Sequence, residues 1–212
     1  MRKTTLFSVG NLLIAGGILL SMGACGRAEA RGAKVGNAAP AWSLPDTNGK
    51  THKLADFKGK YVVLEWLNHG CPFVKKHYNT GNMQKLQREL TGKGVVWLSV
   101  VSSAPGKQGH YKPAKANRLT KSKKAAPTAV LLDPAGKTGR AYGARTTPHM
   151  YVISPAGRLI YNGAIDDNSS YFKSKADVMK AKNYVRLALN EAMSGKPVSV
   201  KYTRPYGCSV KY

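Results

Sequence analysis

The chain has 212 residues, with 34 lysines and arginines against 10 aspartates and glutamates, and a formal net charge of +24. This length suffices for one domain with a full core, and the sequence excludes a repeat protein because it contains no internal repeat and no low-complexity linker. The lysines are spread over most of the chain without a nucleic-acid-reading module, so we expect no nucleic-acid partner and an attraction to anionic membrane surfaces.

The first thirty residues have the pattern of an export signal. Two basic residues precede a largely apolar stretch at residues 6–24. Ala28-Glu29-Ala30 suits ordinary signal cleavage, which we favour, whereas the residues up to Cys25 resemble a lipoprotein box that would leave Cys25 lipid-anchored. Loss of residues 1–30 removes three basic residues and one acidic residue, which leaves a net charge of +22. We expect a periplasmic or otherwise extracytoplasmic protein.

The rest of the chain alternates strand and helix patterns. We expect an extended entry segment, a tight hairpin turn at Asn48-Gly49, and strands at 61–67, 94–101, 128–132, 149–153 and 158–162. We expect a kinked or split helix after Pro72 with a break at 79–82, a basic surface helix at 112–124, a short helix or turn at 137–142, and one amphipathic helix at 176–193 that stops at Gly195. An extended tail follows, and Trp66, Trp97 and Tyr151 are expected in the core.

Cys71 stands at the junction between the strand at 61–67 and the helix that Pro72 begins. Proline is favoured at the first helical position because its missing N–H would lack a partner there in any case. Cys71 therefore occupies an N-cap position, beside free backbone N–H groups and the positive end of the helix dipole. This environment favours the thiolate, which is the nucleophilic form of cysteine. The sequence thus predicts sulfur chemistry at Cys71.

The order of elements, with a cysteine at a strand-to-helix junction and Thr147-Pro148 before a later strand, resembles the thioredoxin fold. Residues 36–44 and 59–64 are similar to the start of the redoxin branch, which includes the alkyl hydroperoxide reductase/thiol-specific antioxidant proteins and thiol–disulfide proteins. Asn68-His69-Gly70-Cys71-Pro72-Phe73-Val74 resembles a redoxin subgroup with an Asn-x-x-Cys-Pro-Phe-Val site. The resemblance covers about residues 34–194, followed by a tail at 195–212.

This resemblance implies an α/β fold: a central mixed sheet flanked by helices, with an N-terminal β extension and an extended C-terminal tail. It also implies that Cys71 is the redox cysteine and that Pro148 is a cis-proline facing its sulfur. Thr147 would offer backbone groups to a bound peptide or thiol. From their positions alone, rather than from the resemblance, we expect Asn68 to donate a hydrogen bond at the site and Arg145 to help to polarise a peroxide.

The sequence departs from both well-known redox patterns. Thioredoxins carry a second cysteine three residues after the first, where this chain has Val74. Peroxiredoxins carry threonine three residues and proline seven residues before their cysteine, where this chain has Asn68 and Leu64. The usual dithiol mechanism is therefore excluded within the motif, and the residues that activate a peroxide in peroxiredoxins are missing. A second thiol, where the reaction uses one, comes from elsewhere.

Cys208 is the candidate for that second thiol, because Cys71 and Cys208 are the two cysteines left after signal removal. A cysteine on an extended tail can fold back to resolve a sulfenic acid or a mixed disulfide on Cys71. Two alternatives stay open: a static structural disulfide that pins the tail, and an unpaired or intermolecular thiol.

Two histidines flank Cys71 in the sequence. We expect His69 to tune the thiol from the loop, and His77 to pack against it or contact it from the helix. A copper or zinc site built from these residues, with His149 and Met150, is conceivable because thiolate and imidazole are ligands of both metals. We favour no metal and no cofactor, because copper chaperones of this fold use two neighbouring cysteines. The paired Asp166-Asp167 is expected to cap a helix or pair with lysines.

These observations predict an exported thiol-dependent oxidoreductase, acting as a peroxidase or a disulfide exchanger with a thiol electron donor. Cys71 would be the nucleophile and Cys208 its partner. The alternative is a binding protein for a metal or a protein partner, in which a Cys71–Cys208 bridge stays permanently closed.

Overall fold

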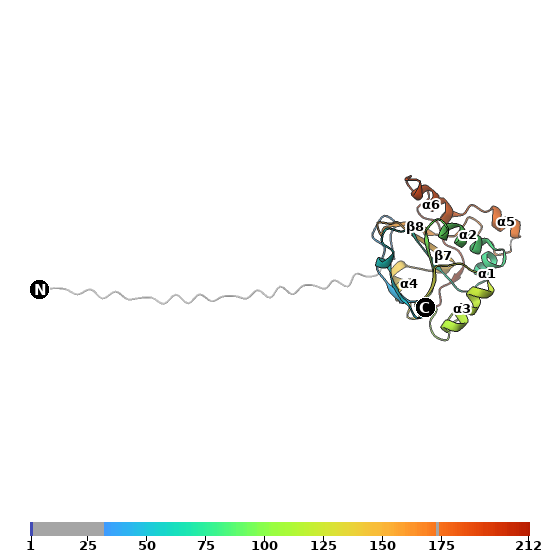
Figure 1. Cartoon of the computed structure of the whole chain (residues 1–212), viewed down its shortest axis with the longest axis horizontal. Helices are drawn as coiled ribbons and strands as arrows, with labels where there is room; N and C mark the ends of the chain where they lie inside the picture. The colour runs from blue at the N-terminus through green and yellow to red at the C-terminus, as the bar shows by residue number, and fades with distance from the viewer. Residues whose placement is uncertain (2–31, 173) are drawn as a thin grey trace.

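The computed structural model describes residue 1, residues 32–172 and residues 174–212. Apart from Met1, the expected export signal lies outside the described residues, and so does Cys25. Within the described ranges, no helix has both the length and the apolar character needed to cross a bilayer. Figure 1 shows these residues as a sheet with helices packed around it.

The centre of the fold is a five-stranded mixed sheet with the strand order β5-β4-β3-β7-β8. Its strands are β3 (Val62–Trp66), β4 (Val96–Val101), β5 (Ala129–Leu132), β7 (His149–Ile153) and β8 (Leu159–Gly163). The β3–β4 and β4–β5 pairs are parallel, and the β3–β7 and β7–β8 pairs are antiparallel. The predicted α/β class with a mixed thioredoxin-like sheet is confirmed.

Both faces of the sheet are covered, which explains why all five residues of β3 are buried. Alternate side chains of a strand point to opposite faces. Val63 therefore packs in the cluster formed with α1 (Pro72–Asn79), α2 (Asn82–Thr91) and α6 (Tyr184–Met193). Leu64 and Trp66 pack in the opposite cluster, formed with the β1 (Ser43–Pro45) and β2 (Thr51–Lys53) hairpin, the 3-10 helix η1 (Leu54–Phe57) and α4 (Lys137–Tyr142). The three aromatic residues expected in the core are fully buried.

One strand residue is a buried carboxylate. Glu65 lies on β3, is fully buried, and accepts hydrogen bonds from the side chains of Tyr78, Gln87, Trp97 and Ser99 at 2.8–3.2 Å. Burial raises the pKa of Glu65 although these donors oppose the shift. The carboxylate ties α1 and α2 to the centre of the sheet.

The expected helix break after Cys71 is confirmed. α1 and α2 are separate helices, and Gly81, the N-cap of α2, has φ = 81°. Glycine reaches this left-handed conformation without the penalty that a side chain imposes. The expected Asn48-Gly49 turn is also present, between the antiparallel strands β1 and β2.

The single helix predicted at 176–193 is wrong. Two helices occupy this stretch, α5 (Lys175–Lys180) and α6, because Ala181 adopts an extended ψ of 142°. The backbone of residues 182–184 instead bonds to residues 165–167, and Asn183 caps α6 by accepting from the Arg186 N–H at 2.8 Å. The apolar spacing continues through this break, so the sequence pattern gives no sign of it. Tertiary pairing overrides helix periodicity here.

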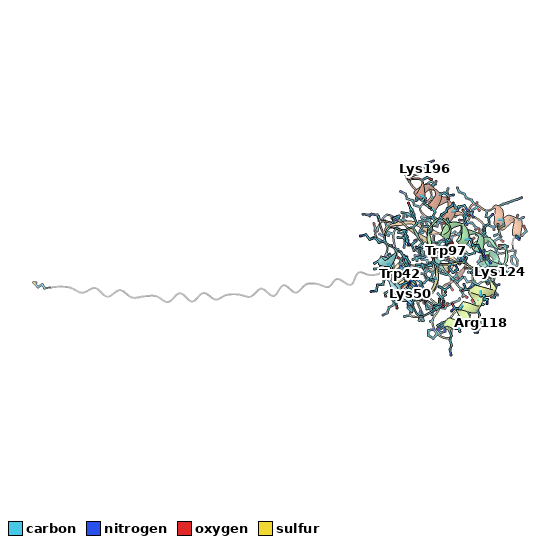
Figure 2. The ribbon with its side chains drawn as sticks, viewed as in Figure 1. Trp42, Lys50, Trp97, Arg118, Lys124 and Lys196 are labelled. Carbon is cyan, nitrogen blue, oxygen red and sulfur yellow. The ribbon has the colours of Figure 1, made fainter. Side chains whose placement is uncertain are left out.

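The surface carries the positive charge. α3 (Pro113–Ser122) is the expected basic surface helix, and Ala116 is its one buried residue. Figure 2 shows Arg118 and Lys196 at the outline of the molecule; Lys50 and Lys124 are also exposed, whereas Trp97 is buried. Most of the basic side chains therefore lie in solvent, as hydration favours.

Candidate redox site

The turn that presents Cys71 is built by Asn68. The Asn68 Oδ1 atom accepts a hydrogen bond from the Gly70 N–H at 2.8 Å, and its backbone carbonyl accepts one from the Cys71 N–H at 3.0 Å. Cys71 then caps α1 with an extended backbone, and Pro72 occupies the first turn as expected. Asn68 therefore shapes the loop, and its side-chain amide points to a second loop.

That second loop follows β4 and was not predicted to belong to the site. The Asn68 Nδ2 atom donates to the Oε1 atom and to the carbonyl oxygen of Gln108, at 3.1 and 3.3 Å. The two loops meet so closely that a Cβ atom on Gly70 would lie 2.8 Å from the Gln108 side chain. No sequence signal identifies Gln108, because it lies 40 residues from Asn68 in a loop without a motif.

The C-terminal tail reaches the site as a short strand. β9 (Cys208–Ser209) pairs antiparallel with β6 (Thr146–Thr147), and Cys208 is the register partner of Thr147. The Cys71 thiol donates to the Thr147 carbonyl oxygen at 3.0 Å, and the Thr147–Pro148 peptide bond is cis, as expected. Three segments that are distant in the sequence thus converge on the Cys71 sulfur.

Gly207 makes this approach feasible. Its φ is 137°, and a Cβ atom at this position would overlap the Thr147 carbonyl oxygen. Since any larger residue would push the tail off β6, the glycine before Cys208 brings the two backbones into contact.

The surroundings of Cys71 favour its thiolate. Burial raises the pKa of the thiol, but hydrogen bonds from the Cys208 thiol, from the Val74 and Cys208 N–H groups and from the Thr147 hydroxyl outweigh burial and lower it. The Thr147 hydroxyl has no other hydrogen-bond partner among the described residues, so it is free to donate to the sulfur when the thiol ionises. These donors stabilise the charged form, as the N-cap position predicts.

Cys208 has the opposite tendency. Its own burial, its hydrogen bond to Cys71 and the negative charge of that neighbour all raise its pKa. Both cysteines are free thiols in this structure; Cys71 is fully buried and Cys208 is partly exposed. The lowered pKa of Cys71 and the raised pKa of Cys208 therefore make Cys71 the member of the pair that ionises first.

The two neighbouring histidines do not touch the sulfur. His69 packs its ring edge-on against Tyr78 at a centroid distance of 5.2 Å, and burial lowers its pKa to about 4. Both ring nitrogens of His77 are engaged elsewhere, in hydrogen bonds to Asn82 and Tyr206. Neither imidazole is among the groups that shift the Cys71 pKa, so the expected direct tuning is not seen in the described part of the chain.

Arg145 lies beside the tail rather than beside the sulfur. Its carbonyl oxygen accepts from the Val210 N–H at 3.0 Å. Its exposed side chain lines a cavity of about 630 Å³ together with Arg204 and His149. In the structure its backbone helps to seat the strand that carries Cys208.

The conceivable metal ligands are dispersed. Within the described ranges, no three His, Cys, Asp or Glu side chains gather as a metal site would require. Met150 is fully buried in the core, and His149 Nε2 hydrogen-bonds to Asn162 Oδ1 at 2.8 Å. Asp166 is buried beside Tyr206, and the Lys76 charge acts on it, which agrees with the expected pairing with a lysine. Asp167 accepts from the Lys182 backbone N–H at 3.0 Å.

Comparison with known proteins agrees with this geometry. Residues 35–162 match the sequence pattern of the AhpC/TSA family, a stretch that contains Cys71, Thr147 and Pro148 but not Cys208. The chain is 30% identical over 125 residues to the thiol-disulfide oxidoreductase ResA of Bacillus subtilis, which covers 59% of this chain and 64% of that protein. The match thus spans less than two thirds of the relative's length.

Solved structures share the fold. An uncharacterised conserved protein from Geobacillus kaustophilus superposes with a TM-score of 0.72 at 24% identity, covering 84% of this chain and 92% of the other. A putative thiol:disulfide interchange protein DsbE from Chlorobium tepidum gives a TM-score of 0.50 at 25% identity, covering 61% and 84%. Because the family pattern spans more than half of the sequence, this chain is a member of the AhpC/TSA family.

Proposed function

We propose that the protein is a thiol–disulfide oxidoreductase in which Cys71 is the nucleophile and Cys208 the resolving cysteine. The observation that carries the proposal is the pairing of β9 with β6, which places Cys208 opposite Thr147, the residue whose carbonyl oxygen accepts the hydrogen bond from the Cys71 thiol. The name of the B. subtilis relative, a thiol-disulfide oxidoreductase, supports this reaction class over peroxide reduction. The Arg145 side chain is exposed and is not among the groups that shift the Cys71 pKa, so it gives peroxide chemistry no added support.

The reaction proceeds in two exchanges. The Cys71 thiolate attacks one sulfur of a substrate disulfide; a Cys71–substrate bond forms, and the other half leaves as a thiolate. The Cys208 thiolate then attacks the Cys71 sulfur, which closes the Cys71–Cys208 disulfide and releases the second half as a thiolate. The protein loses two electrons and the substrate gains two, and a dithiol reductant regenerates both cysteines.

The charge on the sulfur orders these steps. While Cys71 is a thiolate, it raises the pKa of Cys208 and keeps that thiol protonated. Once Cys71 is joined to substrate, its sulfur carries no negative charge. The hydrogen bond from Cys208 to that thiolate and the repulsion between the two sulfurs, which both opposed ionisation of Cys208, are then lost. Cys208 therefore becomes nucleophilic only after the first exchange.

The test uses the reduced protein and hydroxyethyl disulfide, a small neutral substrate. The wild type should consume the disulfide and form the Cys71–Cys208 bond, whereas Cys208→Ser should stop at a mixed disulfide on Cys71 that mass spectrometry detects. Cys71→Ser should lose at least about 99% of the rate, because it lacks the nucleophile. Unchanged consumption by Cys71→Ser would refute the assignment, and a parallel assay with hydrogen peroxide would reveal a peroxidase.

We also propose that the chain works outside the cytoplasm, with residues 34–194 as the redox domain and residues 195–212 as its tail. The apolar stretch after two basic residues supports export. Mass spectrometry of the mature N-terminus separates the two routes: cleavage after Ala30 gives a soluble protein, and a lipid-modified Cys25 gives an anchored one. An uncleaved chain that starts at Met1 would reject both.

A further inference from the structure

Two residues before Cys208, the tail buries a tyrosine hydroxyl in a polar cluster. The Tyr206 hydroxyl donates to Asp166 Oδ1 and accepts from His77 Nε2 at 3.1 Å. The direction of the second bond is fixed, because the Asn82 amide donates to His77 Nδ1 at 2.8 Å and so leaves the ring proton on Nε2. Burial lowers the His77 pKa to about 3 and, with Asp166 nearby, holds the pKa of Tyr206 far above its usual value, so both stay neutral.

The Tyr206 ring is held by the helix that Cys71 caps. The Lys76 ammonium lies 4.8 Å from the centroid of the ring, and the Phe73 ring lies 5.9 Å away. Lys76 also donates to the carbonyl oxygens of Asn168 and Ser170, which follow Asp166 in the chain. These contacts join the tail, α1 and the loop after β8 at one point.

Tyr206 and Cys208 act from the same face of the tail. Alternate residues of an extended chain point to the same side, and here both side chains point into the protein on either side of Gly207. Thr203 hydrogen-bonds to Tyr161 and Ala164 upstream, and Tyr212 to Ala144 downstream. Between those two anchors, Tyr206 is the contact that ties the Cys208 segment to α1.

We propose that Tyr206, Asp166, His77 and Lys76 form a latch that sets how much of the time Cys208 lies against Cys71. The inference rests on the proposed function and adds positioning residues to it. Cys71 is fully buried while the tail is seated, so a substrate disulfide reaches its sulfur only when the segment between Thr203 and Tyr212 lifts. The second exchange requires the same segment to return. A stronger latch therefore slows the access of substrate to Cys71, and a weaker latch slows the attack of Cys208 on the mixed disulfide.

The first test measures the effective concentration of Cys208 at Cys71, from the equilibrium of the reduced protein with glutathione and glutathione disulfide. Tyr206→Phe keeps the ring beside Lys76 but removes the hydroxyl and its hydrogen bonds to Asp166, His77 and the Lys76 ammonium. We expect the effective concentration to fall about tenfold, since a tenfold change corresponds to about 1.4 kcal/mol and a hydrogen bond to a charged group contributes that much. Tyr202→Phe is the matched control, because this tyrosine of the same tail is 62% exposed.

The second test measures entry. In a Cys208→Ser background, a bulky maleimide should label Cys71 about tenfold faster when Tyr206→Phe is added, and at an unchanged rate when Tyr202→Phe is added. Tyr78→Phe removes a buried hydroxyl whose hydrogen bonds go to Glu65, at 2.9 Å, and to Gln87, and not to the tail. It should lower the thermal midpoint without changing either readout, which separates latch opening from general loss of stability.

Equal values for Tyr206→Phe and Tyr202→Phe in both assays would overturn the latch. If Tyr206→Phe does not fold, Asp166→Asn replaces it, because it keeps an acceptor for the hydroxyl and weakens the bond; it should shift both readouts in the same direction. Failure of the proposed function would look different from failure of the latch. In that case Cys71→Ser, with Tyr206 in place, would consume the disulfide as fast as the wild type.

Discussion

At the scale of residues, the site depends on hydrogen bonds to one sulfur atom. The donors come from the N-terminus of α1, from Thr147 and from both the side chain and backbone of Cys208. An N-cap cysteine predicts the first of these from the sequence alone. The others come from segments brought together only by folding, and local patterns carry no information about them.

Removal of the Cys208 thiol should therefore raise the pKa of Cys71. The Cys208 thiol is the hydrogen-bond donor that lowers the Cys71 pKa most. Because Cys208→Ala removes this donor, less Cys71 thiolate should form at a given pH. Iodoacetamide labelling of Cys71 followed against pH should show an inflection at lower pH in the wild type than in the variant. Ser209→Ala, on the exposed side of the same strand, should leave the curve in place. An unchanged inflection in Cys208→Ala would show that the two thiols do not interact.

At the scale of elements, the tail strand β9 is the part of the site that sequence reasoning could name but not place. Cys208 stood out because it was the second cysteine left for the reaction. Its separation of 137 residues from Cys71 leaves open whether the two meet. The pairing of β9 with β6 answers that question, since Cys208 faces Thr147 in register.

Gly207→Ala tests this pairing. The added methyl group would overlap the Thr147 carbonyl oxygen, so β9 should leave β6 and Cys71–Cys208 disulfide formation should slow at least about tenfold. Gly195→Ala is a useful control: it also has a positive φ, 71°, but no atom lies within 4 Å of the new methyl group. Stopped-flow oxidation of both variants by hydroxyethyl disulfide would decide the matter. Equal rates would mean that the tail reaches Cys71 in another way.

The helices and strands themselves were largely predictable, with one instructive exception. Apolar runs in the sequence predict the strands of the sheet, and the polar, glycine-containing break around Gly81 predicts the division of α1 from α2. The division of α5 from α6 was missed, because Val178, Ala181 and Val185 keep helical spacing across it. The residues between the helices bond to the chain after β8, and that long-range contact decides the backbone.

At the scale of the whole molecule, buried histidines predict acid sensitivity. Burial lowers the pKa of His149 to about 4, so this ring stays neutral in the folded chain while the unfolded chain gains a proton near pH 6.5. Stability from this residue is complete above about pH 6.5 and declines as the pH falls toward 4. At pH 5 the loss should be about 2 kcal/mol.

Urea unfolding at pH 7 and pH 5 measures this effect. His149→Gln should reduce the difference in unfolding free energy between the two pH values by about 2 kcal/mol. The exposed His110→Gln serves as its control. A pH difference that is the same in His149→Gln and the wild type would show that this ring does not stay neutral in the fold.

The charge of the molecule predicts a second property on this scale. Residues 90–132 contain eight lysines and arginines and no aspartate or glutamate, and α3 presents Lys115, Arg118 and Lys121 to solvent. We expect binding to anionic lipid vesicles that falls steeply as salt rises, because mobile ions screen exposed charges. Reversal of those three α3 charges to glutamate should weaken binding at least about tenfold in vesicle sedimentation. Equal binding to neutral vesicles would contradict an electrostatic origin.

The reduction potential of the Cys71–Cys208 pair is the most direct test of the central claim. Equilibration with glutathione or dithiothreitol buffers, followed by mass spectrometry of the two cysteines, gives this value. A working redox pair should have a potential between about −120 and −270 mV, within the range of thiol–disulfide oxidoreductases. A potential below about −300 mV would mark a structural bridge that cellular thiols do not open, and would contradict the account.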